Sequence, residues 1–348
     1  MSFIDFTAIV REAWNAYDDT RQIIRIEDIS AKVSTNYVFR ITFRDHTFIV
    51  AKLSYFGKYE HFVEDHSIIN SLSNNLPAPF ENFLARSLMK GNSLFVYRFQ
   101  NEILDAWVVF YRPIEIKKRL PRRLDDEQII KLGEQLAQFH KACHNIRNTL
   151  PESSKTLKMD IDSLLRMLET DYGKYEYRVY MKQIRKQTDL FFEHREKLQS
   201  DTFDKIPVFV DWNIGNFSIF PNLDLYSRWD YDWFRMSYRV LDFYFFSRVV
   251  SDAGDRTVFS YYINTMMEER FILFLKEYHQ VNPITADEIR FLKEAYRFFI
   301  LNYVIKDGKY FFNEQYATKL QAEAFEIYLP SVDRDFDAER IIEALELK

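Results

Sequence analysis

Apolar positions in the first third of the chain alternate between helical and strand-like spacing. A polar turn, Arg44-Asp45-His46, separates two β-branched and aromatic runs and predicts a hairpin. The pattern as a whole predicts a sheet accompanied by two helices. The predicted elements are a helix over 3–20, strands within 21–54, a helix over 59–72 and strands near 93–99 and 107–111.

Beyond Pro113 the spacing becomes helical through most of the remaining sequence. Asp125, with Gln128 three residues later, has the spacing of a capping box and predicts a helix start. A strand-rich part at 1–111 and a helical part at 112–348 predict an α+β protein of two lobes.

One block within the helical part carries candidate chemistry. Apolar runs flank Asp211 and Asn216, and a short turn then leads to Asp230 and Asp232. Phosphoryl transfer from ATP uses such a set, because one carboxylate orients the attacking hydroxyl while other oxygens hold Mg²⁺ against the phosphates. Mg²⁺ takes oxygen ligands and often only one or two protein carboxylates. Asp and Asn are also frequent in ordinary turns, so the prediction depends on both clusters occurring together.

This block resembles the catalytic and metal-binding loops of the aminoglycoside phosphotransferase and choline kinase family, a small-molecule branch of the protein-kinase-like fold. The family pattern H-G-D-x-H-x-x-N is matched by residues 209–216, which read F-V-D-W-N-I-G-N. The pattern I-D-[WFY]-[ED] is matched by 229–232, and D-[LI]-A by 242–244, twelve residues after the metal-binding aspartate.

The resemblance implies a role for each matched polar residue. Asp211 would be the catalytic base, and Asn216 and Asp230 would bind Mg²⁺ with Asp232 close by. Asp242 would be structural and would tie the catalytic loop to the following helix. The fold implied is bilobal and protein-kinase-like, with a small antiparallel β N-lobe, a larger mainly helical C-lobe and the nucleotide between them.

The block also departs from the family pattern. Phe209-Val210 replaces the His-Gly before the catalytic aspartate, and Asn213 replaces the histidine after it. The usual glycine between the two later aspartates is missing from 233–237. The catalytic oxygens remain, but the residues that shape the loop differ. Leu136-Ala137-Gln138-Phe139-His140 resembles a helix end of the family, which implies a structural position for His140 behind the catalytic loop.

Lys52 lies in an otherwise apolar predicted strand. A buried charge without a partner is costly, so this lysine needs either a carboxylate or an open face. By resemblance, Lys52 would contact the α- and β-phosphates and pair with an acid on the next helix. Glu64 is the preferred partner because its side chain reaches further, and Asp65 fits the helical pattern equally well.

Two further segments resemble nucleotide-binding parts of the family. The run Ser34-Thr35-Asn36 matches the loop that covers the nucleotide, and its hydroxyl, amide and backbone groups would bind phosphate. An ordinary polar turn is the alternative. The strand near 107–111 resembles the one that enters the hinge between the lobes, where backbone groups from about Val109 to Arg112 would bind adenine.

Composition narrows the class of protein further. The 348 residues are 47% hydrophobic and 28% charged, which is typical of a globular protein with a sizeable core. A net charge of −5 provides no basic field for nucleic acid. Cys143 is the only cysteine, so no intramolecular disulfide is expected and the cytoplasm is the predicted location. Neither a secretory signal nor an apolar run of membrane-spanning length is present, so no membrane association is expected.

Glycine is scarce, with seven residues where average usage predicts about 24. A glycine-rich phosphate loop is therefore missing, and this is the strongest argument in the sequence against ordinary nucleotide binding.

We predict an enzyme that transfers phosphate from ATP, with Mg²⁺, to a hydroxyl of a small molecule. The alternative is a catalytically impaired binding or regulatory protein on the same fold, suggested by the missing glycines and the lost His-Gly. A protein kinase is the third possibility and matches less well, because the H-R-D, D-F-G and A-P-E strings are absent. The pattern identifies neither the acceptor nor the oligomeric state.

Overall fold

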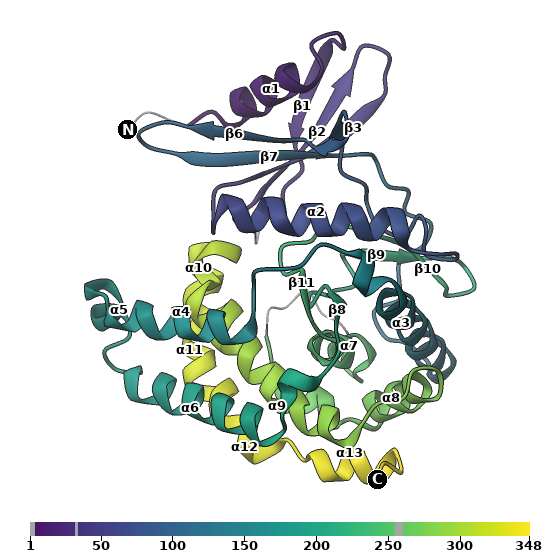
Figure 1. Cartoon of the computed structure of the whole chain (residues 1–348), viewed down its shortest axis with the longest axis vertical. Coiled ribbons are helices and arrows are strands. Elements are labelled where there is room, and N and C mark those ends of the chain that lie inside the picture. Colours follow the sequence, from purple (N-terminus) through teal and green to yellow (C-terminus); the bar gives the residue numbers. More distant parts are fainter. Residues whose placement is uncertain (1–3, 32–33, 255–259) are drawn as a thin grey trace.

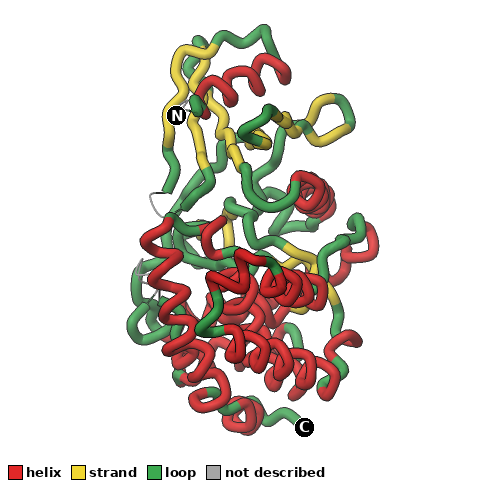
Figure 2. The backbone as a smooth tube through the Cα atoms, turned by 90° about the vertical axis from the view of Figure 1, so that its left-hand side faces the viewer, coloured by secondary structure: helices red, strands yellow, loops and turns green. Residues whose placement is uncertain are grey.

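The chain folds into a small, sheet-bearing N-lobe and a larger, mainly helical C-lobe, as Figures 1 and 2 show. The computed structural model describes residues 4–31, 34–254 and 260–348. This arrangement confirms the predicted α+β fold. In the part of the chain that is described, no helix combines the length and apolar character that crossing a membrane requires.

Five antiparallel strands form the N-lobe sheet in the order β1-β2-β3-β7-β6. Side chains alternate along β2, where Phe39 and Ile41 are buried and Arg40 is exposed. The helix α1 covers one face through Val10 and Trp14, which pack in a core with these strand residues. The elements are α1 (Phe6–Tyr17), β1 (Ile23–Asp28), β2 (Tyr37–Phe43), β3 (Phe48–Ser54), β6 (Val96–Gln100) and β7 (Asp105–Tyr111).

The helix α2 (Tyr59–Asn75) lies between the sheet and the C-lobe helices (Figure 1). Its buried residues Ile68 and Leu72 join the large C-lobe core rather than the core beneath α1. The helix is therefore packed against the C-lobe, although it follows β3 directly in the sequence. A small hairpin of β4 (Met89–Lys90) and β5 (Ser93–Leu94) follows it.

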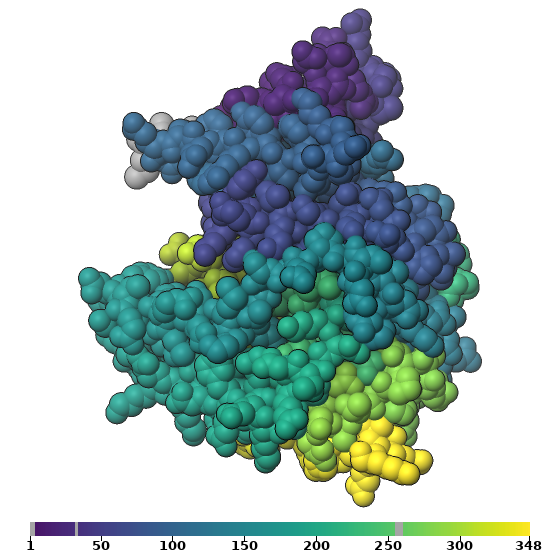
Figure 3. All heavy atoms as spheres, viewed as in Figure 1, coloured from purple at the N-terminus to yellow at the C-terminus, as the bar shows by residue number. Residues whose placement is uncertain are grey.

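The C-lobe begins with α3, whose predicted start is confirmed, since Asp125 is its N-cap and forms a capping box with Gln128. The space-filling view shows this lobe as the wider part of the molecule (Figure 3). Its α-helices are α3 (Asp126–Ile146), α4 (Leu157–Glu169), α5 (Asp171–Glu176), α6 (Met181–Lys197), α7 (Phe243–Val250), α8 (Glu269–Val281), α9 (Ala286–Phe299), α10 (Gly308–Phe311), α11 (Glu314–Glu323), α12 (Leu329–Asp335) and α13 (Ala338–Ala344).

Two short antiparallel pairs at the top of the C-lobe position the candidate site. The strand β8 pairs with β11, and β9 pairs with β10, so the loop between β8 and β9 and the loop between β10 and β11 lie close together. These strands are β8 (Lys205–Val208), β9 (Phe217–Ile219), β10 (Leu225–Arg228) and β11 (Arg235–Tyr238).

Irregular helical turns complete the C-lobe. Among the described residues, the 3₁₀ turns are η1 (Arg147–Thr149), η2 (Ser200–Thr202), η3 (Arg239–Leu241) and η4 (Ile263–Met267). Two others, η5 (Ile300–Lys306) and η6 (Ala324–Tyr328), are π-helical. Such π-helical turns are uncommon and often occur at functional sites.

Candidate active site

The loop after β8 is held from behind by Asp242. One carboxylate oxygen of Asp242 accepts hydrogen bonds from the backbone N–H groups of Phe209 (3.0 Å) and Val210 (2.7 Å). The other oxygen lies 2.9 Å from Nε2 of His140. Both side chains are completely buried, and burial lowers the pKa of His140. The expected structural roles of Asp242 and His140 are confirmed by these contacts.

Asp211 is hydrogen-bonded to the two asparagines of its own loop. Its carboxylate accepts from Nδ2 of Asn213 at 2.5 Å and from Nδ2 of Asn216 at 3.0 Å. Burial, and after it the nearby charge of Asp230, raises the pKa of Asp211 to about 7. A carboxylate with a pKa in that range is suited to accept a proton near neutral pH.

A buried arginine supports the loop from below and was not identified from the sequence. Arg228 ends β10, and its guanidinium donates to the backbone carbonyl of Asp211 at 2.9 Å. Its Cζ lies over the rings of both Phe209 (4.4 Å) and Trp212 (4.2 Å). The aromatic and charged residues next to Arg228 in the sequence did not indicate that it would contact these two rings.

Two aspartates after β10 meet the lysine of β3. Nζ of Lys52 lies 3.0 Å from Oδ1 of Asp230 and also contacts Oδ1 of Asp232. Burial opposes the charge of Lys52, but the two carboxylates outweigh it and raise the pKa of the lysine. Burial would also raise the pKa of Asp230, yet the Lys52 ammonium holds it below its usual value. Burial raises the pKa of Asp232 to about 6 despite the same ammonium.

The predicted pairing of Lys52 with an acid of α2 is wrong in this structure. Glu64 accepts hydrogen bonds from Oγ of Ser153 and from the backbone N–H of Ser154, both at 2.8 Å. Asp65 instead pairs with Lys155 at 2.6 Å. Both candidate acids, Glu64 and Asp65, therefore contact the segment before α4.

The loop predicted to cover the nucleotide extends down to the C-lobe. Nδ2 of Asn36 donates to Oδ2 of Asp232 at 2.6 Å. The hydroxyl of Thr35 donates to the carbonyl of Tyr310, and Ser34 forms a β-bridge with Phe312. These contacts place the loop across the front of the cleft between the lobes.

A first cavity of about 660 Å³ lies between the lobes and brings together most of the predicted site residues. Apolar side chains of β2 and β3 form its roof, and residues 111–114 form one wall. Its predicted site residues are Ser34, Asn36, Lys52, Asn216, Asp230 and Asp232.

Val109 does not line this cavity, which corrects its predicted position. It is completely buried in β7 and is paired with Lys52 of β3 on one side and Val96 of β6 on the other. Its backbone therefore belongs to the interior of the sheet. The part of this segment that faces the cavity runs from Tyr111 to Ile114.

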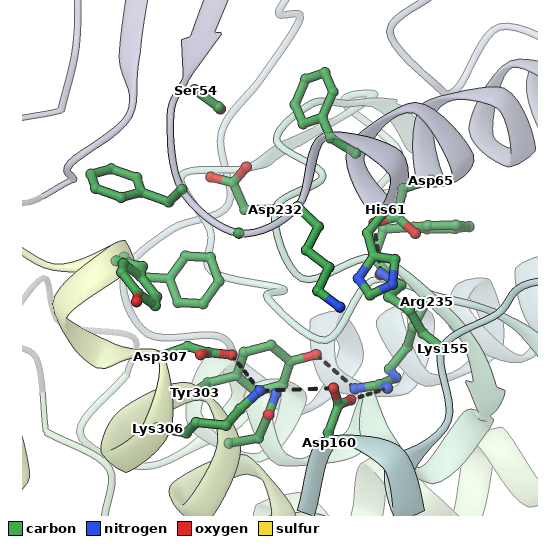
Figure 4. Close-up of a pocket in the computed structure, with 18 of the residues that line it drawn as sticks. Ser54, His61, Asp65, Lys155, Asp160, Asp232, Arg235, Tyr303, Lys306 and Asp307 are labelled. Carbon is green, nitrogen blue, oxygen red and sulfur yellow. Dashed lines mark hydrogen bonds and ion pairs between the residues drawn. The ribbon is translucent and has the colours of Figure 1, made fainter. Parts of the chain in front are cut away.

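A second cavity of about 650 Å³ lies beyond the aspartates, between α2 and the helices of the C-lobe (Figure 4). It shares Asn36, Tyr231 and Asp232 with the first cavity. Figure 4 shows Asp160, Arg235 and Lys306 joined along one side. The walls of this cavity come from segments far apart in the chain.

Solved structures share this fold along nearly the whole chain. A microcompartment-associated aminopropanol kinase has a TM-score of 0.61 at 16% identity, with 98% of this chain and 99% of that chain covered. Amicoumacin kinase in complex with AMP-PNP and Ca²⁺ has a TM-score of 0.59 at 12% identity, with 97% of both chains covered. An aminoglycoside 2′-phosphotransferase in complex with GDP has a TM-score of 0.56 at 14% identity, with 95% of this chain and 100% of that chain covered.

These comparisons identify the protein-kinase-like fold of small-molecule phosphotransferases. No protein-family model matches the sequence, and no curated protein sequence matches it. A shared fold does not define a function, which depends on the residues of the site.

Proposed function

We propose that this protein transfers the γ-phosphoryl group of ATP, with Mg²⁺, to a hydroxyl of a small molecule. The first cavity would hold the nucleotide, with adenine against the backbone of 111–114 and the phosphates toward Lys52. The second cavity would hold the acceptor. Free Cys143 is buried, and we propose the cytoplasm, where ATP is available, as the location.

The observation that carries the proposal is the wall between the two cavities. Asp232 and Asn36 line both, and Lys52, Asn216 and Asp230 line the first at the same end. Phosphoryl transfer depends mainly on positioning two substrates and stabilising charge between them. Two cavities that share Asn36 and Asp232, with Lys52 in contact with Asp232 on the side of the first cavity, provide both conditions.

Each residue of the site would have a separate role in the reaction. Lys52 would bind phosphate oxygens. Asp211 lines neither cavity, but its carboxylate lies 3.0 Å from Nδ2 of Asn216 on the wall of the first cavity. From there Asp211 would orient the acceptor hydroxyl and take its proton. The amide of Asn216 points its nitrogen at Asp211, which leaves its oxygen for a different ligand. That oxygen, with the carboxylates of Asp230 and Asp232, forms an oxygen donor set that fits Mg²⁺. Bound Mg²⁺ would neutralise phosphate charge.

No group of three or more His, Cys, Asp or Glu side chains suited to a metal occurs within the described ranges. This agrees with a site completed by nucleotide phosphates and water, as Mg²⁺ sites of kinases are. Such a site would bind the metal weakly without nucleotide.

Thermal unfolding with ATP or ADP, each with and without Mg²⁺, tests the proposal. A ligand that binds the native state raises its stability by about 2.7 kcal/mol at 100 times its dissociation constant. We expect a shift that requires Mg²⁺ and is lost in Asp230→Ala. The matched control is Asp224→Ala, in the turn between β9 and β10, where this half-buried aspartate pairs with Lys131 outside both cavities. Absence of any shift at millimolar nucleotide contradicts the proposal.

A non-catalytic binding protein is the second candidate. It is favoured by the contacts of Asp232, whose two oxygens already face Lys52 and Asn36. Nucleotide would have to displace these partners before the carboxylate could hold a metal. The same unfolding experiment separates the candidates, because a chain with this site permanently closed would show no Mg²⁺-dependent shift.

A further inference from the structure

The second cavity contains four carboxylates, and all of them already face a cation. All four line its walls, where Asp65 pairs with Lys155 at 2.6 Å and Asp160 pairs with Arg235 at 2.6 Å. Asp307 pairs with Lys306 at 2.9 Å, and Asp232 faces Lys52. A positively charged ligand would therefore have to break an existing ion pair to find a carboxylate.

The positive groups of the same cavity are not all matched in this way. Lys58 and Arg166 line the cavity, and neither has an ion pair within the described part of the chain. His61 lines it next to them, and burial together with Lys155 and Lys58 lowers its pKa. The cavity therefore has an excess of positive charge, with Lys58 at the start of α2 and Arg166 in the last turn of α4.

The start of α2 adds to this field. Lys58 is the N-cap residue of this 17-residue helix, and no side chain caps the first N–H groups. Uncapped N–H groups and the helix dipole favour an anion at this end. Glu60, the acid of the first turn, is 4.0 Å from Arg98 of the N-lobe sheet.

A buried amide on the opposite wall supplies a different kind of contact. Asn302 belongs to the π-helical turn η5, lines the cavity and is only 3% exposed. Its Oδ1 has no hydrogen-bond partner among the described residues. A buried acceptor without a donor is costly, and a hydroxyl of a ligand would satisfy it.

We propose that the acceptor bound in this cavity is a hydroxylated small molecule that carries an anionic group, either a carboxylate or a phosphate. Lys58, Arg166 and the N-terminus of α2 would bind the anion, and Asn302 would accept a hydrogen bond from a hydroxyl. This inference rests on the proposed function only in calling the ligand an acceptor. The anion site is defined by the residues of the cavity and does not depend on phosphoryl transfer.

Titration calorimetry on the full chain without nucleotide tests the charge preference directly. The probes are D-gluconate, D-glucose 6-phosphate, D-glucose and D-glucosamine, which keep one carbon skeleton and differ in charge. We expect at least one of the two anions to bind about tenfold or more tightly than glucose and glucosamine. The comparison of gluconate with the sugar phosphate distinguishes a carboxylate site from a phosphate site.

A second experiment removes the charges of Lys58 and Arg166. In Lys58→Gln/Arg166→Gln we expect the anion to lose about tenfold or more in affinity, with unchanged Mg²⁺–AMP-PNP binding. The matched control, Lys182→Gln/Lys186→Gln, removes two exposed lysines of α6 outside the cavity and should retain the affinity of the unaltered protein.

The outcomes separate this inference from the proposed function. Equal or tighter binding of glucosamine, or no binding of either anion, overturns the anionic acceptor even if Mg²⁺–AMP-PNP binds. A double variant that loses nucleotide and keeps the anion shows that these cations serve the nucleotide, and it overturns the inference too. If the protein binds the anion but does not bind Mg²⁺–AMP-PNP, the proposed function is wrong and the anion site is still supported.

Discussion

Oδ1 of Asp242 lies 2.7 Å from the backbone nitrogen of Val210. Val210 has a φ of +62°, a left-handed conformation that costs a residue with a side chain about 1–2 kcal/mol. This valine stands where the family pattern has glycine, directly before Asp211. The loop therefore keeps the backbone conformation suited to glycine, and Asp242 offsets part of the strain.

Removal of that carboxylate should destabilise the protein and disturb the loop. Asp242→Ala leaves the buried N–H groups of Phe209 and Val210 without their acceptor, at about 1–3 kcal/mol each. We expect a loss of about 3 kcal/mol in urea unfolding and at least a hundredfold loss of phosphoryl transfer.

An exposed aspartate provides the control for this change. Asp252 forms a surface ion pair with Arg123, so Asp252→Ala should alter stability by less than about 0.5 kcal/mol. If Asp242→Ala unfolds at the same urea concentration as the unaltered protein, other contacts hold the strained turn.

Substitutions of Asp211 and Asp230 should impair different steps of the proposed reaction. Asp211→Asn keeps the size of the side chain but removes the base, so we expect turnover to fall by about 10²–10⁴-fold with unchanged Mg²⁺–AMP-PNP binding. Asp230→Asn should instead weaken binding of the Mg²⁺–nucleotide complex. Calorimetry and steady-state rates measure the two effects separately. Wild-type turnover in Asp211→Asn would show that a different group accepts the proton.

Sequence reasoning located the parts of the site that depend on short spacings. Asp211 and Asn216 belong to one loop, and their distance is set by only five residues. Asp230 and Asp232 follow after a tight hairpin, so the two clusters have little freedom to separate. The α+β division was predicted because the apolar spacing alternates between strand-like and helical before Pro113 and is mostly helical after it.

Sequence reasoning failed where a residue's partner comes from a distant segment. Glu64 was expected to pair with Lys52, but the chain before α4 supplies Ser153 and Ser154, which bind the glutamate. Lys52 instead meets Asp230, whose carboxylate lies across the cleft. Val109 was misplaced because periodicity identifies a strand without showing which of its residues lie inside the sheet.

Removing the charge of Lys52 should make the protein respond more strongly to metal. Lys52→Met leaves Asp230 and Asp232 facing each other without their ammonium, and we expect a loss of about 1–2 kcal/mol in metal-free stability, since Asp230 is 39% exposed. Mg²⁺ alone should then raise the melting temperature more than it does in the unaltered protein. Lys182→Met, on the exposed face of α6, is the control. Equal responses to Mg²⁺ would mean that Lys52 does not neutralise these carboxylates.

His66 should make the stability of the protein depend on pH. The imidazole is buried between α2 and β7, where Nδ1 donates to the carbonyl of Phe62 (2.9 Å) and Nε2 accepts from the hydroxyl of Tyr111 (2.5 Å). Burial lowers its pKa to about 3. In the unfolded chain the imidazole takes up a proton near pH 6.5, whereas in the folded protein it stays neutral until about pH 3. The unfolded state is therefore increasingly favoured as the pH falls below 6.5.

The size of this effect follows from proton linkage at about 1.4 kcal/mol per pH unit. Between pH 6.5 and 5 the unaltered protein should lose about 2 kcal/mol through this residue. His66→Gln cannot take up the proton, so its free energy of unfolding should fall less over the same interval. This holds even if the variant is already less stable than the unaltered protein at pH 7.5. Urea unfolding of both proteins from pH 7.5 to 5 measures the difference. His46→Asn, in the exposed turn between β2 and β3, should keep the slope of the unaltered protein. Parallel curves for His66→Gln and the unaltered protein would show that the pKa of His66 is the same in the folded and unfolded states.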